Sequence, residues 1–170
     1  VHGSRGLGDV YKRQKIPKKL KLINCVGGGS SAYGFWSEFI DFEKKQVELI
    51  GVEAGGPKKS QLHAAPLSRG AKIGVLHGAA SYVCQNNEGQ IKETESISAG
   101  LDYPGVSPIH CFLKDAKRAR YTYATDEDAL RAYKLVTKYE KLNPSLEPSH
   151  AFAEAIKIAP KLSKDTISVS

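Results

Sequence analysis

The sequence predicts an α/β fold with parallel strands. Two observations lead to this class: segments typical of strands and helices alternate from residue 20 onward, and a triglycine turn joins the first strand to the first helix. The chain has 170 residues, 41% of them hydrophobic, so it can bury about two thirds of its unfolded surface. We therefore expect one globular domain that needs no disulfide or metal for stability.

The first predicted unit is a strand, a helix and a second strand. Leu20 to Val26 is an apolar run and predicts a strand. Ser31 to Phe42 has apolar residues at helical spacing, and Val47 to Glu53 is again typical of a strand. This order predicts two parallel strands joined by a helix.

The middle of the chain is predicted to be loop-rich, with one hairpin. Glycine and proline interrupt residues 55–70. Residues 82–85 and 90–93 flank the turn-forming segment 86–89, so a hairpin is expected there.

The last part of the chain predicts two helices and a strand. Thr125 to Asp128 resembles a capping box at the start of a helix. The positions of this helix expected to face the core are Leu130, Tyr133, Leu135 and Val136. Ser149 is predicted to cap a further helix that Pro160 ends, and Thr166 to Val169 is typical of a last strand.

The triglycine turn, Gly27 to Gly29, is the segment most indicative of function. Three glycines remove every side chain from the turn, so its backbone N–H groups can converge on an anion at the start of the next helix. Ser30 and Ser31 add hydroxyl donors. The pattern predicts a phosphate site, and the number of donors suits a terminal phosphate monoester.

Two other interpretations of the turn remain open. Gly27, Gly29 and Ala32 satisfy a loose dinucleotide fingerprint, and Glu53 lies at a strand end where it could contact a ribose, as in a nucleotide-binding or NAD-dependent domain. The turn could equally belong to a noncatalytic α/β module that binds phosphate. No Gly-Lys-Ser/Thr sequence follows the glycines, which excludes a Walker loop.

The positive charge of the chain is concentrated at its beginning. The formal net charge is +7, and almost all of it lies within residues 1–21. A basic tail lacks the docking element of a duplex-binding domain, so nucleic-acid binding is not expected. Residues 1–14 have no periodic apolar pattern, and we interpret them as a foreign-looking, disordered leader. The predicted domain is 15–170.

The cysteines and the hydropathy pattern indicate a cytoplasmic protein. Cys25, Cys84 and Cys111 lie far apart and fit neither a disulfide framework nor a zinc site, which favours reduced thiols. No apolar run approaches the roughly 18 residues of a membrane span, so no membrane association is expected. The histidines have no metal-ligand spacing, and core or loop positions are expected for His63, His77, His110 and His150.

Five segments together resemble the C-terminal half of the tryptophan synthase beta chain family. They occur in the family's order from about residue 20 to the end: 27–32 (GGGSSA), 49–56 (LIGVEAGG), 63–67 (HAAPL), 96–106 (SISAGLDYPGV) and 146–151 (LEPSHA). The resemblance implies a partial three-layer αβα fold that binds pyridoxal phosphate. It also implies the reaction of L-serine with indole to give L-tryptophan, in a complex with an alpha chain and a second beta chain.

The resemblance also assigns roles to individual residues. The cofactor phosphate would be held by Gly27, Gly28, Gly29, Ser30 and Ser31. Gly100 and Glu147 would lie beside the pyridine ring, and Asp102 would face the hydroxyl group of the substrate serine; Asp102 and Glu147 are the catalytic candidates. Glu147 is equally well interpreted as a carboxylate that stabilises a helix start. A monovalent cation, K⁺ or Na⁺, would be bound by the backbone carbonyls of Val26, Gly27, Leu101, Tyr103 and Gly105.

The sequence also departs from the family pattern. Ser31 stands where the family usually has Asn, which replaces an amide NH₂ group by a single O–H donor. Ser107 and Ile109 replace residues that are usually Gly and Glu. No histidine is followed by lysine, so the family motif with the lysine that binds the cofactor covalently is missing. We expect this chain to be a fragment that is inactive alone.

Overall fold

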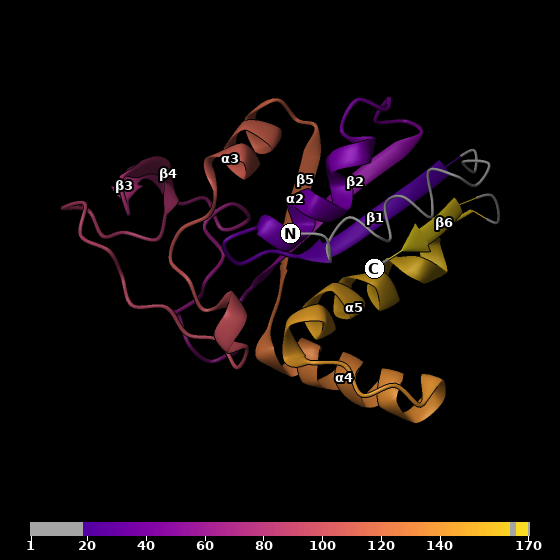
Figure 1. The fold of residues 1–170 in the computed structure, drawn as a ribbon. Helices are drawn as coiled ribbons and strands as arrows, with labels where there is room; N and C mark the ends of the chain where they lie inside the picture. Colours follow the sequence, from indigo (N-terminus) through magenta and orange to yellow (C-terminus); the bar gives the residue numbers. More distant parts are fainter. Residues whose placement is uncertain (1–18, 164–165, 170) are drawn as a thin grey trace.

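The computed structural model describes residues 19–163 and 166–169, which form a four-stranded parallel sheet and a separate hairpin (Figure 1). The predicted leader, residues 1–14, lies outside the described residues. The sheet has the strand order β5-β2-β1-β6. Its strands are β1 (Lys19–Cys25), β2 (Val47–Ala54), β5 (Ala119–Ala124) and β6 (Thr166–Val169).

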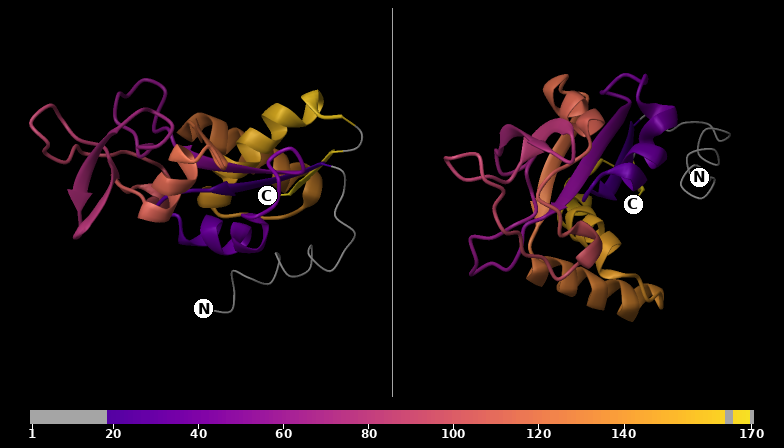
Figure 2. Two further views of the ribbon diagram at one scale, coloured as in Figure 1. Left: turned by 90° about the horizontal axis from the view of Figure 1, so that it is seen from above. Right: turned by 60° about the vertical axis from the view of Figure 1, so that its left-hand side comes forward.

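Helices cover both faces of this sheet. On one face, Leu22 of β1 and Leu49 of β2 pack in a core cluster with Trp36 of helix α2 (Ser30–Trp36). On the other face, Ile23 and Ile50 pack with Ala151 of helix α5 (Leu146–Ile158). The alternation of side chains along each strand sends neighbouring residues to opposite faces. Figure 2 shows α2 and α5 on opposite sides of the sheet, which confirms the predicted αβα layers.

The first helix is shorter than predicted. The helix α2 ends at Trp36 and continues as the 3₁₀ turn η1 (Ser37–Phe39), whereas the sequence predicted a helix to Phe42. The guanidinium group of Arg118 donates hydrogen bonds to the carbonyl oxygens of Phe39 (2.7 Å) and Ile40 (2.6 Å). Arg118, the residue before β5, thus holds the carbonyls at the end of this segment, which would have no partner within a helix in either case.

The hairpin lies earlier in the chain than predicted. Strands β3 (Lys72–Leu76) and β4 (Ala79–Val83) pair antiparallel around a His77-Gly78 turn. In the segment predicted as a hairpin, the structure has one isolated bridge between Gln85 and Ile91. The side chain of Asn86 accepts hydrogen bonds from the N–H groups of Glu88 and Gln90, which closes a tight turn without a paired strand on each side.

The remaining elements complete the layers. They are the 3₁₀ turn η2 (Ala99–Leu101), helix α3 (Pro108–Asp115), helix α4 (Asp126–Glu140) and the 3₁₀ turn η3 (Ala159–Lys161). None of the helices in the described part of the chain has both the length and the apolar composition to cross a membrane.

The two helices predicted after residue 125 are present as α4 and α5, but their buried residues and one cap differ from the prediction. The capping box of α4 is confirmed, because Thr125 accepts a hydrogen bond from the Asp128 N–H and Asp128 bonds back to the Thr125 backbone. The buried residues of α4 are Ala129 and Ala132, not the larger apolar residues predicted, since small side chains allow close packing on α5. The helix α5 begins after Ser145, so Ser149 is inside the helix and does not cap it.

Candidate functional site

The triglycine turn lies at the carboxyl end of β1, at the point where the strand order reverses. From β1 the chain passes outward to β2 and β5, and then returns to β6 on the other side of β1. Ligands of open α/β sheets bind outside the carboxyl ends of the strands at such a switch point. The turn then leads directly into α2.

Two groups from the start of α3 hold the carbonyl oxygens of the turn. The N–H of Ser107 donates to the Gly28 oxygen at 2.9 Å, and the ring Nε2 of His110 lies 2.7 Å from the Gly29 oxygen. The peptide bonds are trans, so each N–H that follows one of these carbonyls points the opposite way. The amides of Gly29 and Ser30 are thereby directed away from α3.

The amide groups of the turn have no acceptor in the described part of the protein. None of the described residues accepts a hydrogen bond from the backbone N–H groups of residues 27–32. The first N–H groups of a helix have no partner within it, and here the glycines of the turn extend this set to a run of six donors suited to binding an anion. The residues of the turn thus fit a phosphate group.

One side of the turn is open and the other is closed. A Cβ atom at Gly28 would have no neighbour within 4 Å, and Ser30 and Ser31 are exposed. A Cβ at Gly29 would lie 2.2 Å from the His110 ring, and one at Gly27 would lie 2.7 Å from the Gly100 oxygen. A ligand therefore has access over Gly28 and the two serines.

The structure brings Gly100 and Glu147 together beside the turn. The N–H of Gly100 donates to Oε1 of Glu147 at 3.1 Å, and Gly100 itself lies against Gly27. Hydrogen bonds from the backbone N–H of Glu147 and from Gly100 lower the pKa of the Glu147 carboxyl. Glu147 is in the first turn of α5, so it also has the helix-start position that the sequence allowed.

The loop that carries Asp102 is anchored by the β3–β4 hairpin. Nδ1 of His77 lies 3.0 Å from the Tyr103 hydroxyl oxygen and the two rings stack, while the Cys84 N–H donates to the Pro104 oxygen at 2.8 Å. Asp102 is exposed and follows η2 directly. The loop thus presents a carboxylate to solvent from a fixed backbone.

The backbone segments predicted to bind a cation come from two neighbouring loops. Gly27 lies against Leu101, and Gly105 lies against Tyr103. The Leu101 carbonyl, however, accepts a hydrogen bond from the Tyr103 N–H at 2.9 Å. A cation at the carbonyls of Val26, Gly27, Leu101, Tyr103 and Gly105 stays a prediction.

Glu53 does not lie where a ribose-binding residue would lie. Its side chain is 1% exposed and accepts hydrogen bonds from the Leu67 N–H (3.0 Å), the Ser68 N–H (2.7 Å) and the Ser68 hydroxyl (2.6 Å). Burial raises the pKa of Glu53 to about 7. The carboxylate fixes the 64–68 loop on the sheet, which argues against the dinucleotide interpretation.

Comparison with known proteins shows which family the sequence is similar to. No family model matches this chain. A tryptophan synthase beta chain from Chromobacterium violaceum is 52% identical over 147 residues, which is 86% of this chain. The resemblance to the tryptophan synthase beta chain is confirmed. The chain spans 36% of the length of this curated relative.

Solved structures show the same fold at low identity. A threonine deaminase from T.th. matches 89% of this chain and 46% of its own, with a TM-score of 0.59 and 17% identity. A fungal L-serine ammonia-lyase from Rhizomucor miehei matches 98% of this chain and 50% of its own, with a TM-score of 0.62 and 18% identity. The predicted fold class of this tryptophan synthase beta relative is thus confirmed.

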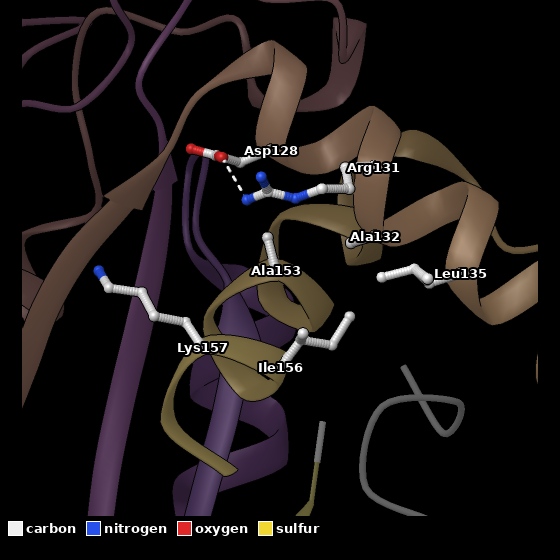
Figure 3. Close-up of a pocket in the computed structure, with 7 residues that line it drawn as sticks. All are labelled: Asp128, Arg131, Ala132, Leu135, Ala153, Ile156 and Lys157. Carbon is white, nitrogen blue, oxygen red and sulfur yellow. Dashed lines mark hydrogen bonds and ion pairs between the residues drawn. The ribbon is translucent and has the colours of Figure 1, made fainter. Parts of the chain in front are cut away.

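A groove between α4 and α5 is unrelated to the turn. Figure 3 shows Arg131, Leu135 and Ile156 lining it. Arg131 pairs with Asp128 at 2.8 Å, and Lys157 on the facing helix pairs with Glu154 at 3.4 Å. Because these charges are already paired, the groove has no convergent polar groups of a binding site.

The sequence did not identify the groups that orient the turn. His110 was expected to be a core or loop histidine, and it is fully buried, but its contact with Gly29 was not predicted. Tyr121, which contacts His110, was not singled out either. The only sequence signal is the short interval between the 96–106 segment and His110, which does not specify a partner.

Proposed function

We propose that this chain contributes the phosphate site and part of the cofactor pocket of a tryptophan synthase beta chain. The observation that carries the proposal is the run of unpaired amides at 27–32 at the end of β1. The 52% identity to a tryptophan synthase beta chain supports it. The complete enzyme is proposed to convert L-serine and indole to L-tryptophan, the last step of tryptophan biosynthesis, in the cytoplasm.

The cofactor would be pyridoxal phosphate. Bound there, it would act as the electron sink of the reaction, while the protein orients it and controls protons. Gly27, Gly28, Gly29, Ser30 and Ser31 would hold the phosphate. The single hydroxyl of Ser31 offers fewer donors than an amide side chain, so we expect moderate phosphate affinity.

Gly100 and Glu147 would border the pyridine ring. Their hydrogen bond fixes the Gly100 backbone next to Gly27, which supports a ring site beside the proposed phosphate turn. Glu147 would carry a negative charge, because its pKa is lowered by backbone N–H groups. Its role would be to hold this corner of the pocket and to face the ring edge.

Asp102 would contact the substrate. It lies in an exposed position on an anchored loop, and no described residue takes up its carboxylate by a hydrogen bond or ion pair. A free carboxylate can accept a hydrogen bond from the serine hydroxyl and orient it as the leaving group. A monovalent cation, K⁺ or Na⁺, is proposed near the carbonyls of Gly27 and Leu101.

The partners of the complete enzyme are proposed from the family. They would be a tryptophan synthase alpha chain and a second beta chain. The 170-residue chain has no His-Lys pair, so it lacks the lysine that the family uses to bind the cofactor covalently. We therefore propose that this chain alone produces no tryptophan from serine and indole.

A titration of the chain with three ligands tests the proposal. Inorganic phosphate and pyridoxal phosphate are expected to change the fluorescence of the single tryptophan, Trp36, and NAD is not. Tighter binding of pyridoxal phosphate than of phosphate would support a cofactor pocket. Equal binding of both would instead indicate a phosphate module, and binding of NAD alone would contradict the proposal.

Gly28 offers a matched pair of variants for this titration. A side chain at this position would enter open space, so Gly28→Asp and Gly28→Asn should both fold. The Asp variant places a negative charge over the amides and is expected to abolish phosphate binding, whereas the Asn variant is expected to weaken it less. Equal affinities of the two variants would contradict a phosphate at this turn.

A further inference from the structure

We infer that His110 is a positioning residue for the phosphate turn: its ring, oriented by Tyr121, holds the Gly29 carbonyl so that the neighbouring amides face the ligand. The inference rests on the proposed function, because it concerns the same turn. His110 lies on α3, 81 residues from Gly29 in the sequence, and is fully buried.

The hydrogen-bond partners define the tautomer of His110. A carbonyl oxygen can only accept, so Nε2 must carry the proton that is shared with Gly29 at 2.7 Å. A neutral ring then has Nδ1 as an acceptor, and the Tyr121 hydroxyl, 2.8 Å away, donates to it. Burial lowers the pKa of His110 and raises the pKa of the Tyr121 phenol, which keeps both groups neutral.

The surrounding residues leave little freedom for the side chains of His110 and Tyr121. A Cβ at Gly51 would lie 2.6 Å from the Tyr121 ring, so the glycine makes the space that Tyr121 occupies on β5. Trp36 contacts both rings edge-to-face, with centroid distances of 5.7 Å to His110 and 6.4 Å to Tyr121. The ring of His110 is thus held on several sides.

The hydrogen bond from His110 fixes the peptide between Gly29 and Ser30. Gly29 has a φ of +99°, a conformation that side-chain-bearing residues rarely adopt, and its carbonyl accepts from His110 and from the Tyr33 N–H. If the His110 bond is lost, the peptide between Gly29 and Ser30 can rotate. The amide of Ser30 would then no longer be fixed toward the open side.

Substitutions of His110 separate the donor to Gly29 from the shape of the ring. In His110→Gln, the side-chain amide can place an N–H near the position of Nε2. In His110→Asn, the side chain is too short to reach Gly29, and in His110→Phe the donor is absent. Tyr121→Phe removes only the group that orients His110.

The measurement is the affinity of the 170-residue chain for inorganic phosphate, monitored by Trp36 fluorescence. Relative to wild type, we expect an unchanged affinity for His110→Gln and a loss of about threefold to tenfold for His110→Asn and His110→Phe, the range for one lost hydrogen bond. Tyr121→Phe is expected to show a smaller loss. Wild-type affinity of the Asn, Phe and Tyr121 variants would overturn the inference.

A second buried histidine controls for general destabilisation. His150 is also fully buried, but it lies on α5, where its Nδ1 is 2.9 Å from the Leu146 carbonyl oxygen and not beside the turn. His150→Asn should lower stability and leave phosphate affinity unchanged; an equal loss of affinity there would overturn the positioning role. If the Asn and Phe variants of His110 do not fold, the phosphate affinities of Tyr121→Phe and His110→Gln are compared instead. Weaker binding by Tyr121→Phe than by His110→Gln would support the inference, and equal affinities would overturn it. Absence of phosphate binding by the wild-type chain would contradict the proposed function itself.

Discussion

The ring of His110 donates a hydrogen bond to the carbonyl oxygen of Gly29, with Nε2 and the oxygen 2.7 Å apart. This contact joins α3 to the turn after β1. Together with the bond from the Ser107 N–H to Gly28, it directs the amides of Gly29 and Ser30 away from α3. The conformation of the turn therefore depends on residues from two distant parts of the sequence.

Replacing Gly29 by alanine should damage both stability and the turn. The residue has a positive φ, and the new Cβ would lie 2.2 Å from the His110 ring. We expect a loss of about 1–3 kcal/mol in the free energy of unfolding, measured by urea denaturation. Gly28→Ala is the control, since its Cβ meets no atom within 4 Å and its stability should be near wild type. Equal stabilities of the two variants would contradict the described geometry.

Removal of the Glu53 carboxylate should loosen the 64–68 loop. Glu53→Ala leaves the N–H groups of Leu67 and Ser68 without their acceptor, and we expect a loss of about 2–4 kcal/mol in the free energy of unfolding. Ser68→Ala removes only one of the three hydrogen bonds, so its loss should be clearly smaller. A near-neutral Glu53→Ala variant would show that the loop is held by other contacts.

Three fully or partly buried histidines should make the protein less stable in mild acid. Burial lowers the pKa values of His63, His110 and His150 below the ordinary value near 6.5. The unfolded chain then binds more protons than the folded one, so stability falls as the pH decreases below about 6.5. Unfolding of wild type and His150→Gln between about pH 7.5 and 5.5 measures this effect, and the variant should lose less stability over this range.

Glu53 should have the opposite pH dependence. Its pKa is raised to about 7 in the folded protein, so the folded state binds more protons than the unfolded state between the two pKa values. The stability contributed by the protonated group is present at low pH and is lost as the pH rises toward about 7. The stability of wild type relative to Glu53→Gln should therefore fall from about pH 5 to about pH 8. A constant difference would contradict a raised pKa.

The capping box of α4 should contribute measurably to the free energy of unfolding. Thr125→Ala removes the acceptor for the Asp128 N–H, and we expect a loss of about 1 kcal/mol in the free energy of unfolding. Ser107→Ala is the matched change at the N-cap of α3, where the side chain makes no capping bond, and it should have little effect. Thermal unfolding of both variants measures the difference.

Much of the fold could be predicted from local pattern. The strands at Leu20, Val47 and Thr166 and the capping box at Thr125 depend on residues close together in sequence, and all are present in the structure. The end of α2 and the hairpin were predicted incorrectly. The first concerns the exact end of a helix, which local pattern specifies poorly, and in the second the Asn86 side chain closes a turn whose flanking residues form only a bridge.

The candidate site could be predicted only where it depends on residues close together in the sequence. The glycines at 27–29 are typical of a close backbone approach, so the position of the turn between β1 and α2 could be predicted from the sequence, while the bound anion stays a prediction. Glu53 was misread as a candidate ribose ligand because its burial follows from the fold of the 64–68 loop. The hydrogen bonds that join Tyr121, His110 and Gly29 could not be predicted, since no sequence pattern specifies which donor binds the Gly29 carbonyl.

The most direct test of the account is a measurement of backbone amide resonances of the chain during titration with pyridoxal phosphate. The amides of Gly28, Gly29, Ser30 and Ser31 are predicted to shift with the ligand, and pyridoxal without its phosphate should leave them unchanged. If pyridoxal phosphate binds while these four resonances stay constant, the phosphate lies elsewhere and the account is contradicted.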